Sequence, residues 1–205
     1  GYTYKVGRQD ATVGATALLY NNNYKIGKRT FVDGVTVTGK VGVASIKGIL
    51  AKEDNIGKDN QLYVISTSVN PVKPLTVGAT LARYGVESGP DSNHYAVNAA
   101  YTLGKMTFIG EYAQSTADTD NTAYDYGITY SVTPKTSVYI IKHKVETNAD
   151  MGKNTDFENG QKGLHYGVNY KMTPTADLDV LVFNNQNIND NGKNTSFRTT
   201  LTVKF

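Results

Sequence analysis

The chain has 205 residues, of which 39% are hydrophobic, and it carries 20 glycines, 15 tyrosines, no tryptophan and no cysteine. No apolar run approaches the roughly 20 residues that a spanning helix needs, which excludes a helical membrane protein. The absence of cysteine excludes disulfides and thiolate zinc sites, and a net charge of +3 from scattered lysines is too small to indicate nucleic-acid binding.

Alternation of apolar and polar side chains predicts about twelve β-strands of roughly ten residues. The first covers residues 2–9, where Tyr2, Tyr4 and Val6 share one face. An asparagine-rich connection over residues 10–30 follows, and we expect it to make few packing demands. The other strands are expected at residues 32–39, 43–51, 62–69, 75–86, 94–103, 106–115, 122–132, 136–147, 163–172, 177–187 and 195–205.

The connections between these strands alternate in length. Gly104-Lys105 and Thr133-Pro134-Lys135 are short, whereas residues 54–60, 87–93 and 148–161 are longer and rich in Asn, Asp, Gly and Lys. Short turns at one end and long loops at the other are typical of an outer-membrane meander. The sequence therefore predicts an all-β fold: one transmembrane antiparallel up-and-down β-barrel over residues 1–205, with both termini at the short-turn end.

Aromatic residues recur near both ends of four strands, on the apolar face. Because tyrosine rings favour the boundary between membrane and water, we expect two girdles around a lipid-facing belt. The girdle residues are Tyr95, Tyr101, Tyr124, Tyr130, Tyr166, Tyr170, Phe197 and Phe205. A simpler explanation is that aromatic residues generally prefer strands. Their recurrence near both strand ends favours girdles over this explanation.

The opposite face of the strands is polar and is expected to line a water-filled lumen. A dry core would not accept so many polar groups without partners, and no amphipathic helix pattern exists to cover the tyrosine-rich face of a soluble sheet. The charged candidates for the pore lining are Lys47, Glu111, Asp125, Lys142, Lys144, Lys171, Asp179 and Arg198, with Arg8 joining them if a bulge shifts its phase. Opposed charges across a pore tune which ions pass through it. The alternative is that these side chains are simply solvated on a water-facing wall and have no effect on selectivity.

Two short segments carry a family resemblance. Tyr4-Lys5-Val6-Gly7-Arg8-Gln9-Asp10 and Phe31-Val32-Asp33-Gly34-Val35 resemble a pairing in bacterial general porins, although Val32 is an extra residue in the second element. The strand ending in Phe205 is similar to the closing strand of outer-membrane barrels. The chain most resembles the porin barrel of S-layer-homology (OmpM-like) outer-membrane proteins.

That resemblance implies a barrel of about sixteen strands, trimeric assembly and an amino-terminal peptidoglycan-binding domain, which is not visible in this sequence. It also implies that about four strands precede residue 1. The alternative is a small, complete twelve-stranded oligosaccharide channel.

No residue pattern indicates an enzyme, a metal site or a cofactor. His94, His143 and His165 show neither metal-ligand nor triad spacing, and the loop carboxylates match no calcium-loop pattern. We therefore expect a passive outer-membrane diffusion channel for small hydrophilic solutes or ions, in contact with lipid and assembled as a homotrimer. Residues 10–30 or 148–161 are candidates to fold inward and narrow the bore. A structural barrel that tethers the envelope is the rival.

Overall fold

The computed structural model describes residues 1–22, 31–53 and 59–204, and these form fourteen strands. Their bounds are β1 Tyr2–Gln9, β2 Thr12–Val13, β3 Tyr20–Asn21, β4 Val32–Val41, β5 Ala44–Glu53, β6 Gln61–Val72, β7 Leu75–Gly85, β8 Ser92–Leu103, β9 Met106–Ser115, β10 Thr122–Ser131, β11 Thr136–Val145, β12 Gln161–Thr173, β13 Ala176–Asn187 and β14 Lys193–Val203. No helix among the described residues is both long and apolar enough to span a membrane.

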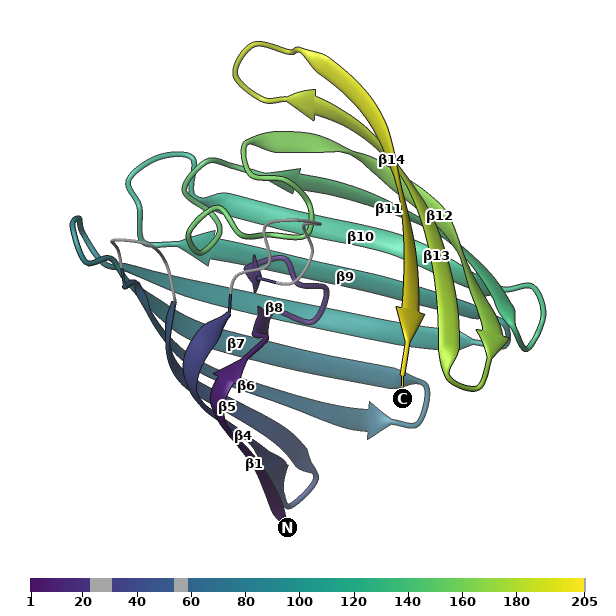
Figure 1. Ribbon diagram of the computed structural model, residues 1–205, viewed down its shortest axis with the longest axis horizontal. Coiled ribbons are helices and arrows are strands. Elements are labelled where there is room, and N and C mark those ends of the chain that lie inside the picture. Colours follow the sequence, from purple (N-terminus) through teal and green to yellow (C-terminus); the bar gives the residue numbers. More distant parts are fainter. Residues whose placement is uncertain (23–30, 54–58, 205) are drawn as a thin grey trace.

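Twelve of the strands form one antiparallel sheet, in which each strand pairs with the sheet strands that come before and after it along the chain. The order is β1-β4-β5-β6-β7-β8-β9-β10-β11-β12-β13-β14, and β2 pairs only with β3. The sheet curls into an open barrel wall with β1 and β14 at its two edges, and both termini lie at the short-turn end (Figure 1). The predicted all-β meander of about twelve long strands is confirmed.

Short turns follow from local backbone chemistry. Leu103 pairs with Met106 across Gly104-Lys105, and Gly104 has a φ of 58°, the left-handed region that a two-residue hairpin needs and that glycine adopts without steric cost. The turn between β4 and β5 uses Gly42 in the same way, with a φ of 59°. Consecutive strands are therefore joined by tight turns and pair directly with each other at the short-turn end.

The two faces of the sheet differ as the alternation requires. Large apolar side chains remain exposed on the convex face, for example Val6, Leu50, Ile65, Leu81 and Val97. Chain segments from two long connections cover part of the concave face. The buried residues gather there, beneath those segments.

The connection after β1 packs much more closely than we expected. Of residues 11–22, Val13, Leu18, Leu19 and Tyr20 have almost no exposed surface. The prediction of few packing demands was wrong, because this segment folds back over the concave wall and buries its own apolar run. Residues 23–30 lie outside the described chain.

Candidate pore and its constriction

The segment after β1 forms a small hairpin on the concave face. Thr12 pairs with Asn21 and Val13 with Tyr20, which brings residues 14–19 to the tip. The Lys47 Nζ atom, from β5, donates to the carbonyl oxygen of Thr12 at 2.7 Å. This hydrogen bond fixes the base of the hairpin to the wall. Figure 1 shows the hairpin, in purple, inside the curve of the sheet.

The tip of this hairpin rests on two wall carboxylates. The backbone N–H groups of Ala15 and Thr16 donate to Glu111 at 3.1 and 2.9 Å. The Thr16 hydroxyl lies 2.7 Å from Glu111 Oε2 and 2.5 Å from Asp125 Oδ2. Gly14 has a φ of 93°, and a Cβ there would lie 2.8 Å from Glu111 Oε1. A glycine is therefore required for this approach.

A second loop, residues 146–160 between β11 and β12, joins the hairpin from the other side. The Met151 N–H donates to Leu19 O at 2.9 Å, and the Asp156 N–H donates to Ala17 O at 3.3 Å. Met151 and Phe157 are buried in the same apolar cluster as the hairpin residues. The two loops thus form one body, which we call the inner lobe: residues 11–22 and 146–160.

Glu53 anchors the inner lobe at the long-loop end of β5. Its side chain is 2% exposed and accepts hydrogen bonds from Tyr20 Oη at 2.8 Å and Tyr84 Oη at 2.7 Å. Asn60 and Asn154 also donate to it through Nδ2, at 2.9 and 3.3 Å. A buried carboxylate needs such donors to offset the loss of water. Burial and Glu53 both raise the pKa of the Tyr20 hydroxyl, so this phenol stays a donor.

All three histidines lie on the wall beneath the second loop. His94 Nδ1 lies 3.2 Å from the carbonyl oxygen of Ala149, and its Nε2 lies 2.8 Å from the Ser92 hydroxyl. The His143 ring lies 4.3 Å from the His165 ring and 5.2 Å from the Phe157 ring, centroid to centroid. The histidines therefore pack against the loop. In the described part of the chain, no three His, Cys, Asp or Glu side chains converge as metal ligands.

A cavity of about 560 Å³ opens between the hairpin and the wall, on the short-turn side of the tip. Most of its lining residues are threonine or serine, together with two lysines and one asparagine. The lining includes Thr12, Thr38, Lys40, Lys47, Thr80 and Asn98. This cavity is the candidate water-filled passage.

The predicted pore-lining residues divide into two groups. The first group lies on the concave face: Lys47, Glu111, Asp125, Lys171, Asp179 and Arg198. Asp179 accepts from the Tyr139 hydroxyl at 3.2 Å, and the Arg198 guanidinium lies 5.2 Å from the centroid of the Phe183 ring. Glu111 and Asp125 have a role that the sequence did not indicate, because they bind the hairpin tip. No pattern in the sequence pairs them with Thr16.

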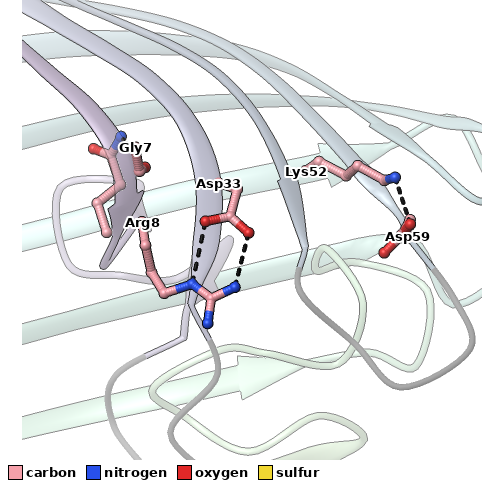
Figure 2. Close-up of polar contacts among 6 residues, drawn as sticks. Gly7, Arg8, Asp33, Lys52 and Asp59 are labelled. Carbon is pink, nitrogen blue, oxygen red and sulfur yellow. Dashed lines mark hydrogen bonds and ion pairs between the residues drawn. The ribbon is translucent and has the colours of Figure 1, made fainter.

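The second group, Arg8, Lys142 and Lys144, lies on the convex face, and their prediction as pore-lining was wrong. Pairing from Gly7 to Gln9 is continuous, so no bulge shifts the phase of Arg8, which instead pairs with Asp33 through two 3.2 Å contacts. Figure 2 shows this pair beside the Lys52–Asp59 ion pair. On β11, His143 is buried inward, so its neighbours Lys142 and Lys144 must point outward.

The predicted girdle residues lie on the convex face wherever the structure describes them. Tyr95 and Tyr101 on β8, Tyr130 on β10 and Phe197 on β14 are exposed. Tyr124, Tyr166 and Tyr170 have the same outward parity, and Phe205 lies outside the described residues. Their contact with the membrane boundary stays a prediction.

Comparison of the sequence with protein families decides the class of this fold. Residues 1–150 match the Gram-negative porin family. The chain belongs to that family. This porin is therefore a β-barrel protein of the bacterial outer membrane. A search among curated proteins finds no match.

Solved outer-membrane barrels share the porin's fold at low sequence identity. A loop L8 deletion mutant of OmpT from Vibrio cholerae aligns with a TM-score of 0.62 at 15% identity, covering 97% of this chain and 74% of that one. OmpT expressed in the outer membrane of the same organism gives 0.60 at 13% identity, covering 98% and 74%. The in-vitro folded trimer form of OmpT gives 0.55 at 15% identity, covering 97% and 73%. These likenesses concern the fold.

Proposed function

We propose that this porin is a passive diffusion channel for small hydrophilic solutes or ions, in which no bond is made or broken. The observation that supports this most directly is the cavity of about 560 Å³, lined mainly by Thr, Ser and Lys residues, between the wall and a hairpin fixed to that wall. A sheet that only tethered the envelope would have no need of a hydrated passage lined by Ser, Thr, Asn and Lys side chains.

The inner lobe sets the narrowest part of the passage in this proposal. Its tip is held on Glu111 and Asp125 from β9 and β10, and its base on Lys47 from β5. The hairpin therefore crosses the bore from one wall to the other. Solutes must pass beside it through the cavity lined by Thr38, Lys40 and Asn98.

The charge along that passage favours anions. Glu111 and Asp125 are nearly buried under the hairpin tip, whereas Lys40 and Lys47 line the cavity. Wall charge and width together set which ions pass. We propose a modest preference for anions over cations, which neutral substitutions at the two lysines would reduce.

Planar-bilayer recording tests the channel and the constriction together. Wild-type protein should give discrete conductance steps, and shortening residues 14–19 to a two-glycine link should enlarge each step, because the bore loses its obstruction. Shortening the loop of residues 188–192, which lies between β13 and β14 outside the inner lobe, is the matched control and should leave the step size unchanged.

Each failure of this experiment has a definite meaning. Absence of steps at any voltage, from protein whose folded barrel is verified by gel mobility, would support the tethering barrel. Equal steps from wild type and the shortened hairpin would remove the inner lobe from the permeation path. Lys40→Gln with Lys47→Gln should shift the reversal potential in a salt gradient toward cations.

The proposal also covers the oligomeric state and the subgroup of outer-membrane proteins that the chain resembles. We propose a homotrimer in contact with outer-membrane lipid, with residues 1–205 forming a single barrel domain of the kind found in S-layer-homology outer-membrane proteins. A trimer form is known for one protein of similar fold, the in-vitro folded OmpT of Vibrio cholerae, and this supports the trimer without extending to its contacts.

A further inference from the structure

The sequence contains two Asn-Gly pairs, Asn159-Gly160 in the second loop and Asn191-Gly192 in the turn between β13 and β14. An asparagine before a glycine can react with its own backbone, because glycine has no Cβ to obstruct the approach of its nitrogen to the side-chain carbonyl carbon. Such a reaction is intramolecular, so its rate depends strongly on how the two groups are positioned. The structure holds the two pairs in different ways.

Asn159 is fixed by its side-chain amide. Its Nδ2 donates to Asp150 Oδ1 at 2.7 Å and to the carbonyl oxygen of Thr147 at 2.9 Å, with the carbonyl oxygen of Glu146 at 3.4 Å. The side chain is half-buried within the inner lobe. Ring closure onto the Gly160 nitrogen would have to break these bonds, so the fold protects Asn159 from this reaction.

The turn that contains Asn191 is open to solvent. Asp190, Asn191 and Gly192 are all exposed, and the turn lies at the end of the sheet far from both termini (Figure 1). Asn191 has a φ of 58°, in the left-handed region that residues other than glycine rarely occupy. An exposed turn in this conformation loses little stability when its backbone rotates, and ring closure needs such a rotation.

A side chain of suitable chemistry contacts each reacting group of Asn191-Gly192. The Gly192 N–H, which must lose its proton before the nitrogen attacks, donates to Asp190 Oδ1 at 2.8 Å. The Asn191 Oδ1 atom, which becomes negatively charged when its carbon is attacked, accepts from Gln186 Nε2 at 3.2 Å. The carboxylate is thus placed to act as a general base, and the amide is placed to stabilise the developing oxyanion.

We propose that Asn191 is a site of self-catalysed deamidation. The Gly192 nitrogen passes its proton to Asp190 and forms a bond to Asn191 Cγ. The bond from Cγ to Nδ2 then breaks, Nδ2 leaves as ammonia with that proton, and a five-membered imide remains. Water opens the imide at either of its two carbonyl carbons and gives aspartate or isoaspartate at position 191. This chemistry is independent of whether the pore conducts.

The product differs from asparagine in charge and, as isoaspartate, in backbone length. Gln186, which contacts Asn191, pairs in the sheet with Lys162 on β12 and with Lys193 on β14, so the new carboxylate arises close to two basic residues. Isoaspartate adds one atom to the main chain and should break the 2.9 Å hydrogen bond from the Asn187 N–H to the carbonyl oxygen of Gly192. A turn at the long-loop end thus gains one negative charge as the protein ages.

Peptide mapping by mass spectrometry tests the proposal on folded, detergent-solubilised protein that is incubated in neutral buffer. Asn191 should convert about tenfold or more faster than Asn159, because the hydrogen bonds that hold Asn159 oppose ring closure. In protein boiled in SDS, both asparagines should convert at comparable rates, since the fold that distinguishes them is lost. Equal rates at the two sites in the folded protein, or no conversion at Asn191, would overturn the proposal.

A double variant tests the two supporting contacts. Gln186→Ala with Asp190→Ala should slow conversion of Asn191 about tenfold or more in the folded protein, because the base and the oxyanion donor are both removed. The same variant should convert like wild type after boiling. Gln114→Ala with Asp118→Ala makes the same changes on β9 and in the loop that follows it, and should leave the rate at Asn191 unchanged.

Folding of each variant is verified by heat-dependent gel mobility. An unchanged rate at Asn191 in the folded double variant would overturn the assignment of Asp190 and Gln186. Equal slowing in the control variant would do the same, because the effect would then not depend on contacts with Asn191.

Discussion

Thr16 is the residue on which the position of the constriction depends most directly. Its hydroxyl lies between Glu111 and Asp125, and its N–H binds the first of them. Hydrogen bonds to charged groups contribute about 1.5–3 kcal/mol each. The loss of one such bond is thus enough to change how often the tip leaves the wall.

Thr16→Val removes the hydroxyl and keeps the side-chain shape. We expect the tip to detach about ten- to a hundredfold more often, since one charge-assisted bond is lost. Single-channel records should show more frequent excursions to a larger conductance. Thr38→Val, in the same cavity but away from the tip, should leave the frequency of these excursions at its wild-type value; equal frequencies in both variants would contradict the anchor.

Asp150 makes the docking of the second loop dependent on pH. Burial raises the pKa of its carboxyl to about 7 from an ordinary value of 3.8, and the Asn159 amide, 2.7 Å from Oδ1, opposes the rise only in part. The docked loop therefore holds a proton more tightly than the released loop. Docking is strongest below about pH 3.8 and weakens as the pH rises through about 7.

Raising the pH from 5 to 8 should therefore increase the fraction of time that the channel spends in the state of larger conductance, with the second loop released. The increase is at most about tenfold per pH unit. Asp150→Asn cannot titrate at this position and should give a shallower profile, with the loop docked more often at pH 8 than in the wild type. Open probability in planar bilayers measures both. A wild-type profile of the opposite slope, or an unchanged slope in the variant, would exclude Asp150 as the cause.

At the scale of elements, the two loops of the inner lobe act together because backbone bonds and a shared apolar cluster join them. The chain has no native cysteine, so a pair introduced at Leu19 and Met151 would be unique. A 2.9 Å backbone hydrogen bond joins these two residues, so their backbones lie side by side, as a disulfide between them would require.

Oxidation of the Leu19→Cys/Met151→Cys variant should suppress the excursions to larger conductance, and a reductant should restore them. A cross-link that forms while the excursions persist would mean that the loops move as one body away from the wall, with the anchor at Thr16 breaking. Either single cysteine variant, treated with the same oxidant, is the control.

Strand pairing was predictable from the sequence because alternation and turn chemistry are local. The phase of β11 was not, since Val138-Tyr139-Ile140-Ile141 is apolar on both faces and gives no sign of which is outward. Burial of His143 beneath Phe157 decides it. The sequence indicated that either loop could fold inward, but it could not show that both do. The reason is that the contacts of the inner lobe join residues as distant in the chain as Thr16 and Asp125. Such pairings leave no periodic signal.

At the scale of the whole molecule, the wall has two edge strands, β1 and β14, with no partner between them among the described residues. In lipid, every backbone N–H and C=O of these strands must be paired. We therefore expect the edges to be covered in the membrane-embedded state.

Gel mobility in detergent tests this at low cost. The folded protein should migrate differently before and after boiling, and a homotrimer should give a band of about three times the mass that disappears on heating. Boiled and unboiled samples with identical mobility would mean that the extracted wall is not closed.

The apolar cluster between the two loops has a consequence for how the porin responds to heat. The wall is held by continuous backbone ladders, whereas the body inside it depends on a handful of side chains such as Leu18, Leu19, Tyr20 and Met151. Small clusters of this kind lose order at lower free-energy cost than a complete sheet. Warming should thus widen the passage well before the cylinder comes apart, so the permeability of the cell surface would itself rise with temperature.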